Sequence, residues 1–209
     1  STRGRTGTAR SVRLDVLDDS SVAEVFADIQ AQGGLDILVN AAGVAAFAPL
    51  SATHDSLWSE VMEINAGGTF RCMRAASRIM APARRGDILN VGSFVGRVGA
   101  YEGTAYAASK GAVAAMSRAA ALELAQLGIR VNCIAPGRID TAIRRPSTAA
   151  YRDFLLQQTP LGRVGSPEEV AALAVMVLSR AVEFLVGETI EIAGGLHSVY
   201  LQSAVGEAS

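Results

Sequence analysis

The sequence is poor in the residues that build disulfides and metal centres. It has 2 cysteines, Cys72 and Cys133, and 2 histidines, His54 and His197. The cysteines lie far apart and form no spaced motif, so we expect reduced, buried thiols in a cytoplasmic protein rather than a disulfide or a metal-binding pair. With so few histidines besides, a transition-metal site built by the protein is not expected.

Long apolar runs and blocks of like charge are missing too. No apolar run approaches the roughly 20 residues that a membrane span needs, and residues 1–10 lack the apolar region of a signal peptide. The formal net charge is −1, and the neighbouring Arg84 and Arg85 are typical of a solvated loop. We therefore expect neither a membrane nor a nucleic acid as a partner.

What is present is the composition of one compact domain. Half of the 209 residues are hydrophobic and 19% are charged, which is usual for a folded protein. A chain of this length can bury enough surface for a single core. We expect residues 1–209 to form one domain, without internal repeats or linkers.

Apolar patterns, caps and glycines divide the chain into alternating strands and helices. Ser21 begins a capping-box pattern that predicts a first helix, which Gly33 and Gly34 end. Ser166 followed by Pro167 predicts the start of the last helix. The expected strands are residues 11–16, 37–40, 87–91, 129–134 and 188–192, and the expected helices run from residue 21 to the glycine pair and over residues 55–80, 105–127 and 166–178.

This alternation indicates the fold class. Strands that are apolar on both faces and alternate with helices favour a parallel sheet covered on both sides. The expected fold class is therefore α/β, a doubly wound parallel sheet in three α/β/α layers. Residues 142–165 have mixed character and are expected to form a lid or substrate loop, with a short helix over residues 151–158.

Polar and glycine positions gather where the expected strands end, which is where ligands bind in a doubly wound sheet. Asp15 ends the first strand, residues 40–43 follow the second, Ser93 follows the third, and residues 136–141 follow the fourth. The sequence therefore predicts a ligand site along this edge of the sheet.

Four residues indicate proton-transfer chemistry. Tyr106 and Lys110 lie four apart on an expected helix, so they share one face. An ammonium beside a phenol favours the phenolate, so we expect Lys110 to lower the pKa of Tyr106 from about 10. Such a tyrosine can give a proton to a carbonyl oxygen or take one from an alcohol, and Ser93 can hydrogen-bond the same oxygen. Asn65, beside two glycines, predicts a helix distortion that frees a backbone carbonyl to hold a water.

These motifs occur in the order and at the spacing of the short-chain dehydrogenase/reductase family, which the chain resembles from residue 11 to residue 195. A lone Tyr-x-x-x-Lys would be weak evidence, but the ordered set is specific. The resemblance implies a compact, single-domain, Rossmann-like oxidoreductase that interconverts an alcohol and a carbonyl with NAD or NADP. It rests on Leu14-Asp15-Val16, Asn40-Ala41-Ala42-Gly43, Asn65, Ser93, Tyr106-x-x-x-Lys110, Arg130-Val131-Asn132, Pro136-Gly137-x-x-x-Thr141, Pro160-Leu161-Gly162-Arg163, Ser166-Pro167-Glu168-Glu169-Val170 and Gly194-Gly195.

The resemblance also implies roles for individual residues. Tyr106 would be the general acid/base, Lys110 would lower its pKa and bind the nicotinamide ribose, Ser93 would hold the substrate oxygen, and Asn65 would anchor a relay water. The substrate would be a small alcohol or carbonyl compound, and the enzyme a homodimer or homotetramer. The cofactor would be contacted by Asp15 and Val16 at its adenine, by Asn40, Ala41, Ala42 and Gly43 beside it, by Tyr106 and Lys110, and by Pro136, Gly137, Ile139 and Thr141.

Several of these positions also have simpler structural interpretations. A Tyr and a Lys four residues apart usually form only a surface pair. Asp15 could cap the turn after its strand, and Gly43 and Gly137 could serve tight turns.

Charged and ionisable residues outside these motifs are interpreted as structural. Arg144 and Arg145 fit the solvated face of a lid better than a site for an anionic substrate. His54 is expected in a helix N-terminal turn on the surface, and His197 in the C-terminal tail is interpreted as structural.

The family's Gly-rich turn, which binds the cofactor pyrophosphate at a helix N-terminus, has no counterpart in this sequence. By resemblance the chain starts at the usual third strand, so a first β-α-β-α unit, on the order of 50 residues, is expected to be absent. In the strand order 3-2-1-4-5-6, residues 11–16 would then either pair with residues 37–40 or leave the sheet with an open edge. The absent unit carries the residue that selects NAD or NADP, so this choice is not readable.

Three smaller departures affect the cofactor side of the motifs. Ala41 stands where the family has a second Asn, Gly92 where it has the first of two serines, and Ala193 where an Asp commonly precedes the glycine pair.

Three functions are compatible with these observations. The one we favour is an NAD(P)-dependent oxidoreductase of which this chain is a fragment. The second is a naturally shortened relative that performs acid/base chemistry without redox or nucleotide, as a dehydratase, isomerase or cyclase. The third is a non-catalytic subunit, which the intact Ser93, Tyr106 and Lys110 disfavour.

Overall fold

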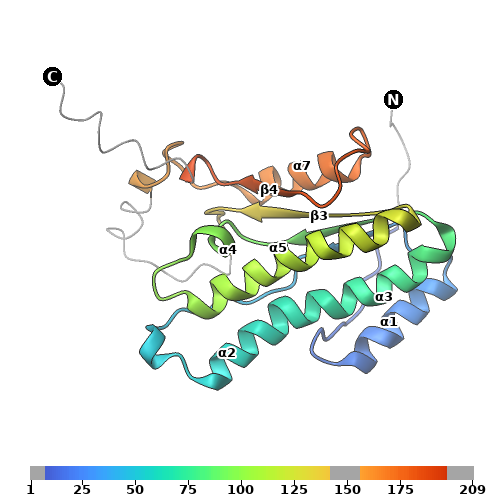
Figure 1. Cartoon of the computed structure of the whole chain (residues 1–209), viewed down its shortest axis with the longest axis horizontal. Helices are drawn as coiled ribbons and strands as arrows, with labels where there is room; N and C mark the ends of the chain where they lie inside the picture. Colours follow the sequence, from blue (N-terminus) through green and yellow to red (C-terminus); the bar gives the residue numbers. More distant parts are fainter. Residues whose placement is uncertain (1–7, 142–155, 197–209) are drawn as a thin grey trace.

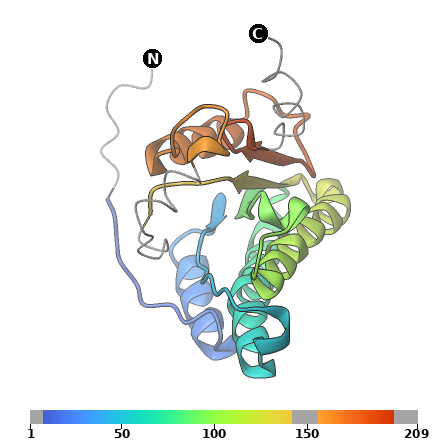
Figure 2. The same ribbon diagram turned by 90° about the vertical axis from the view of Figure 1, so that its left-hand side faces the viewer.

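The computed structural model describes residues 8–141 and 156–196, which form three layers (Figures 1 and 2). The middle layer is a parallel sheet of four strands in the order β1-β2-β3-β4. The strands are β1 (Ile37–Asn40), β2 (Gly86–Val91), β3 (Ile129–Pro136) and β4 (Thr189–Ile192). This confirms the expected α/β class and every predicted strand except the first.

Helices cover both faces of the sheet, as the apolar strands predict. On one face pack α1 (Asp19–Ala31), α3 (Gly68–Ala83) and α5 (Thr104–Leu124), and on the other packs α7 (Pro167–Leu178). The helix expected over residues 55–80 consists of α2 (Asp55–Met62), the π-helical η2 (Glu63–Gly67) and α3 in direct succession. The remaining short elements are η1 (Leu50–Ala52), α4 (Val95–Val98) and η3 (Ala125–Leu127).

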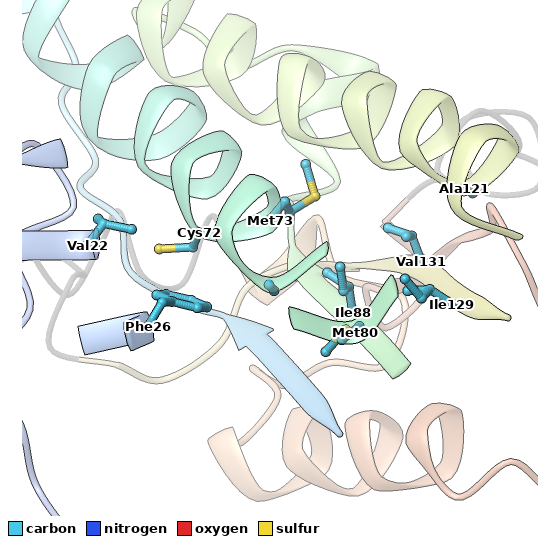
Figure 3. Close-up of a cluster of buried hydrophobic side chains, with 10 residues drawn as sticks. Val22, Phe26, Cys72, Met73, Met80, Ile88, Ala121, Ile129 and Val131 are labelled. Atoms are coloured by element: carbon cyan, nitrogen blue, oxygen red, sulfur yellow. The ribbon is translucent and has the colours of Figure 1, made fainter. Parts of the chain in front are cut away.

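The core lies on both sides of β2. Ile88 joins the larger cluster with Phe26 of α1 and Met80 of α3, which Figure 3 shows between the sheet and its helices. The next residue, Leu89, joins the smaller cluster with Val177 of α7. Because successive side chains of a strand point to opposite faces, two adjacent apolar residues hold a helical layer on each side.

The strand predicted over residues 11–16 is not formed. Leu14 and Val16 instead pack against the larger core cluster, and the Val16 carbonyl accepts a hydrogen bond from Arg71 of α3 over 3.0 Å. Of the two alternatives, the sheet therefore takes the open edge, since β1 has β2 as its neighbour and no pairing with residues 11–16.

The predicted start of the first helix is also wrong, by three residues. The cap of α1 is Asp18, whose Oδ1 accepts the Ser20 amide over 2.8 Å. Ser21 cannot cap a helix that has already begun, and its Oγ accepts the Asp15 amide over 3.0 Å instead. The predicted end is confirmed, because Gly33 and Gly34 both take positive φ just after α1.

The start of α7 forms as the sequence predicts. Ser166 Oγ accepts the Glu169 amide over 3.2 Å, and Glu169 Oε2 accepts the Ser166 amide over 2.8 Å, which closes a capping box. The same carboxylate accepts two hydrogen bonds from Arg163. These bonds from Arg163 and Ser166 lower the pKa of Glu169 to about 2.

A buried ion pair anchors the amino ends of β2 and β3. Arg130 Nε donates to Asp87 Oδ1 over 2.7 Å, and Arg180 Nε donates to Asp87 Oδ2 over 2.7 Å. Arg130 also donates to the carbonyls of Val177 and Leu185. The pair thus ties the end of α7 and the loop after it to the sheet, which the sequence motif around Arg130 did not reveal.

The lid over residues 142–165 lies largely outside the described residues, as does the short helix over residues 151–158. Within the described part of the chain, no helix is long and apolar enough to cross a membrane. Cys72 and Cys133 are both buried and free, as expected.

We predict that Arg130→Met lowers the free energy of unfolding by about 3 kcal/mol, because it leaves a buried carboxylate and several carbonyls with fewer partners. Arg180→Met is the matched control, since the Arg180 side chain is 29% exposed against 9% for Arg130, and its loss is expected to cost about 1 kcal/mol. Urea denaturation measures both. Equal losses for the two variants would contradict the buried pair as the main anchor.

The open edge of the sheet exposes apolar side chains. Ile37 and Val39 of β1 are 45% and 46% exposed, and an unpaired apolar edge strand favours association. We predict that Ile37→Lys slows the growth of light scattering in a concentrated solution, since a charged edge resists strand pairing. Val98→Lys on α4, also at a half-exposed valine, is the control for added charge, and an equal effect there would refute the role of the edge.

Candidate active site

The carboxyl ends of β1, β2 and β3 bring the predicted site residues together. Val39, Leu89 and Asn132 lie side by side in the ladder, so the three strands end in register. Gly43 follows β1, and Ser93 lies two residues beyond β2. The structure therefore brings these predicted residues to one edge of the sheet.

Tyr106 lies in the first turn of α5, half-buried, and Ser93 lies close enough to influence its pKa. Burial raises the pKa of Tyr106 and the Ser93 side chain offsets part of this increase. Ser93 itself is held at the end of β2, where its Oγ lies 3.4 Å from the Pro136 carbonyl and 3.4 Å from the Val95 amide. Two elements distant in sequence, α5 and the end of β2, thus bring these two side chains to the same part of the molecule.

Lys110 is buried one turn after Tyr106. Its Nζ donates to the Val91 carbonyl over 2.9 Å, and burial lowers its pKa. The net effect on the pKa of Tyr106 is an increase, and the lowering expected from Lys110 stays a prediction. The increase arises because desolvation of the phenol dominates, while the contact that lowers the pKa of Tyr106 comes from Ser93.

Asn65 lies inside the π-helical segment η2, which confirms the predicted distortion of the helix. Its Oδ1 accepts the Val44 amide over 2.8 Å, and its Nδ2 donates to the Val44 carbonyl over 2.9 Å and to Ser109 Oγ over 2.9 Å. The Asn65 carbonyl accepts the Thr69 hydroxyl over 2.7 Å. The carbonyl expected to be free for a water therefore already has one protein partner, although a carbonyl oxygen can accept two hydrogen bonds.

Gly43 is required by its neighbours within the protein. A Cβ at this position would lie 2.9 Å from Asn65 Oδ1 and 3.4 Å from Lys110 Nζ. Gly43 therefore allows a close approach of the loop after β1 to two predicted site residues. Upstream, Asn40 Nδ2 donates to Asn90 Oδ1 over 2.8 Å, while Ala41 and Ala42 are exposed.

The segment after β3 is held against β4 and the start of α7. A Cβ on Gly137 would lie 2.7 Å from the Ala193 Cα, so this glycine allows a close approach of two backbones. Ile139 pairs with Gly165 in an isolated parallel bridge. Pro136 ends β3, and Thr141 is exposed at the last residue before the gap in the described chain.

Asp15 and Val16 have structural partners. Asp15 Oδ1 accepts the Leu17 amide over 2.9 Å, which caps a turn, as the alternative interpretation of this residue held. Val16 packs so closely on Gly68 that a Cβ there would lie 2.7 Å from Val16 Cγ2. The contacts of Val16 fix the segment against α3. The contacts of Asp15 and Val16 with a cofactor adenine stay a prediction.

Two residues near Tyr106 were not predicted. Phe47 packs on Tyr106 with ring centroids 5.9 Å apart, and Ser109 bridges Asn65 to the backbone of α5. Neither residue belongs to a motif with a characteristic spacing. Their contacts exist only when α5 has packed against the loop after β1, which carries Phe47, and against Asn65 of η2. His54 lies exposed at the N-terminus of α2, as predicted, although its side chain makes no capping hydrogen bond. His197, Arg144 and Arg145 lie outside the described residues.

Among the residues that the structure describes, no group of three or more His, Cys, Asp or Glu side chains is arranged to hold a metal ion. The site consists of hydroxyl, ammonium and amide groups at a sheet edge. Such groups can bind an oxygen, orient it and move a proton at it, which is the chemistry of carbonyl and alcohol groups.

Known proteins resemble this sequence over most of its length. Residues 2–197 match the family described as "Enoyl-(Acyl carrier protein) reductase". The 3-oxoacyl-[acyl-carrier-protein] reductase FabG of Escherichia coli (strain K12) is 35% identical over 191 residues, 91% of this chain and 78% of that protein. The cis-4-hydroxycyclohexanecarboxylate dehydrogenase of Sinomonas cyclohexanicum is 40% identical over 190 residues, 90% of this chain and 76% of that protein.

A solved structure has the same fold. The gluconate 5-dehydrogenase from Burkholderia cenocepacia J2315, in complex with NADP and tartrate, matches with a TM-score of 0.85 and 34% identity, over 88% of this chain and 74% of that one. The relatives agree in reaction class although their named substrates differ. The chain belongs to the short-chain dehydrogenase/reductase family, and it is an NAD(P)-dependent oxidoreductase that interconverts alcohols and carbonyls.

Proposed function

We propose that Tyr106 is the general acid/base of this oxidoreductase and that Ser93 holds the substrate oxygen. The observation that carries the proposal is the packing of α5 on the end of β2, where Lys110 Nζ donates to the Val91 carbonyl over 2.9 Å and Ser93 lies close enough to Tyr106 to lower its pKa. A substrate oxygen that enters between them can accept from Ser93 and exchange a proton with Tyr106. Geometry that places donor and acid at one point is the main requirement for such catalysis.

Proton transfer at the substrate oxygen follows from these contacts. In alcohol oxidation, the Tyr106 phenolate takes the hydroxyl proton as the carbon–oxygen double bond forms. In carbonyl reduction, the neutral phenol gives its proton to the oxygen. The Lys110 ammonium stabilises the phenolate charge from one turn away. The Asn65 carbonyl is proposed to hold a relay water that connects this proton to solvent.

The residues around Lys110 fit the nicotinamide ribose. The ammonium has three N–H donors, and the Val91 carbonyl uses one of them, which leaves capacity for ribose hydroxyls. Bound NAD or NADP supplies the hydride donor or acceptor at the substrate carbon. Both cofactors remain in the proposal, because the solved relative holds NADP and this sequence has no Gly-rich turn with its selecting residue. The residues assigned to the cofactor are Asp15, Val16, Asn40, Ala41, Ala42, Gly43, Tyr106, Lys110, Pro136, Gly137, Ile139 and Thr141.

We further propose a cytoplasmic homodimer or homotetramer that acts on a small alcohol or carbonyl compound. The exposed Leu122 on α5, at 78% exposure, gives this long helix an apolar outer position of the kind found in subunit interfaces. The relatives' named substrates range from an acyl chain on a carrier protein to a hydroxycyclohexanecarboxylate, so they support the reaction class and leave the carbon skeleton open.

We predict that Tyr106→Phe lowers kcat by about 10²–10⁴-fold, the usual contribution of proton transfer by a placed side chain. The measurement is the change in NAD(P)H absorbance with a panel of small alcohols and ketones. Tyr101→Phe is the matched control, because Tyr101 is 91% exposed and lies outside the hydroxyl pair. Turnover that survives in Tyr106→Phe at the wild-type rate would rule out this assignment.

We predict that Ser93→Ala moves the pH profile of alcohol oxidation to higher pH. The Ser93 side chain lowers the pKa of Tyr106, so its loss leaves burial unopposed and raises that pKa. Because oxidation needs the phenolate, the rising limb of kcat/KM then occurs at higher pH. An unchanged limb with a lowered plateau would show that Ser93 only orients the substrate.

A further inference from the structure

Ser109 joins three segments of the candidate active site. Its Oγ accepts from Asn65 Nδ2 over 2.9 Å and donates to the Tyr106 carbonyl over 2.8 Å. The same Asn65 side chain holds the amide and the carbonyl of Val44. A continuous chain of hydrogen bonds therefore runs from the loop after β1, through the π-helical segment, to the first turn of α5.

The hydrogen bonds that join Val44, Asn65 and Ser109 leave these segments little freedom to move relative to one another. Asn65 and Ser109 are both 0% exposed, so solvent cannot replace a lost partner. The two N–H groups of the Asn65 amide go to Val44 and Ser109, and its oxygen accepts the Val44 amide. A shift of α5 relative to η2 would leave a buried donor unsatisfied, which is costly in a protein interior.

The first turn of α5, which Ser109 holds, also contains residues that are proposed to act in catalysis. Tyr106 lies three residues before Ser109 and Lys110 directly after it, whereas Ser93 comes from the segment after β2. The approach of Tyr106 to Ser93, which lowers the pKa of Tyr106, thus requires that the first turn of α5 has the right position against the rest of the site. Small errors in such positions are expensive, since about 1 Å can cost 10²-fold in rate.

We propose that Ser109 is a positioning residue that fixes the first turn of α5 against Asn65, so that the Tyr106 hydroxyl meets Ser93. The proposal rests on the function proposed above for Tyr106 and Ser93. Ser109 contacts the backbone of Tyr106 and the side chain of Asn65, and it acts through them.

The alternative is that Ser109 merely stabilises its helix by bonding back to a carbonyl, as buried serines often do. The chain offers a matched comparison on the same helix. Ser117 is also 0% exposed. Its Oγ donates to the Val113 carbonyl over 2.7 Å and accepts from Asn90 Nδ2 over 2.8 Å. It has the same two kinds of bond as Ser109 but lies more than two turns beyond Tyr106.

The test is the ultraviolet titration of Tyr106 in the full chain, read as the tyrosinate absorbance of each protein minus that of its Tyr106→Phe counterpart. Measurements stay within the pH range where the far-ultraviolet circular dichroism is unchanged. In Ser109→Ala we expect the Tyr106 titration to move to higher pH, because Tyr106 then lies less close to Ser93. In Ser117→Ala we expect no shift, although both variants lose stability.

Kinetics provide the second measurement. Ser109→Ala is expected to lower kcat by about 10–100-fold and to move the rising limb of alcohol oxidation to higher pH, while Ser117→Ala does neither. Should Ser109→Ala fail to fold, Ser109→Cys keeps nearly the same volume, weakens both hydrogen bonds and is expected to shift the titration in the same direction by less.

The outcomes separate the two proposals. Unchanged Tyr106 titrations in both Ser109 variants, or equal shifts in Ser109→Ala and Ser117→Ala, would overturn the positioning role and leave Ser109 as a stabilising residue. A shift confined to the Ser109 variants supports it. If the titration shifts as expected but Tyr106→Phe retains full turnover, the positioning of Tyr106 stands and the proposed acid/base role fails.

Discussion

The parallel pairing of β2 between β1 and β3 is the constraint on which the site depends. It aligns Leu38 with Ile88 and Ile88 with Val131, so that the three strands end at one edge. A slip of one residue would turn each side chain to the opposite face, and the core would lose Ile88 to the side of α7. The apolar packing on both faces thus selects the register that also brings Ser93 and Gly43 to a common edge.

The two ends of the sheet carry different polar networks. At the amino ends of β2 and β3, the buried Asp87 and Arg130 tie down the end of α7. At the carboxyl ends, Lys110 donates to the Val91 carbonyl, and Asn65 and Ser109 bind each other and nearby backbone groups. The first network contributes to stability, whereas the hydrogen bonds of the second hold the groups that are proposed to act in catalysis. An apolar core separates the two networks.

Burial is the dominant influence on the ionisable groups of the site. It raises the pKa of Tyr106 and lowers that of Lys110, so both groups are shifted toward their neutral forms. A hydroxyl, Ser93, opposes this shift at Tyr106. The pKa of Tyr106 therefore depends on its burial and on the neighbouring Ser93 hydroxyl as well as on nearby charge.

Local chemistry determined much of this protein from the sequence alone. The alternation of apolar segments predicted four strands and their helices, Ser166 predicted its capping box, and the glycines beside Asn65 predicted a distorted helix, because each signal acts between near neighbours. The strand at residues 11–16 failed because a strand needs a paired neighbour, which no local pattern provides. The pKa of Tyr106 and the contacts of Ser109 and Phe47 were decided only by tertiary structure. Desolvation and contacts between distant segments exist only once α5 has packed against η2 and the loop after β1.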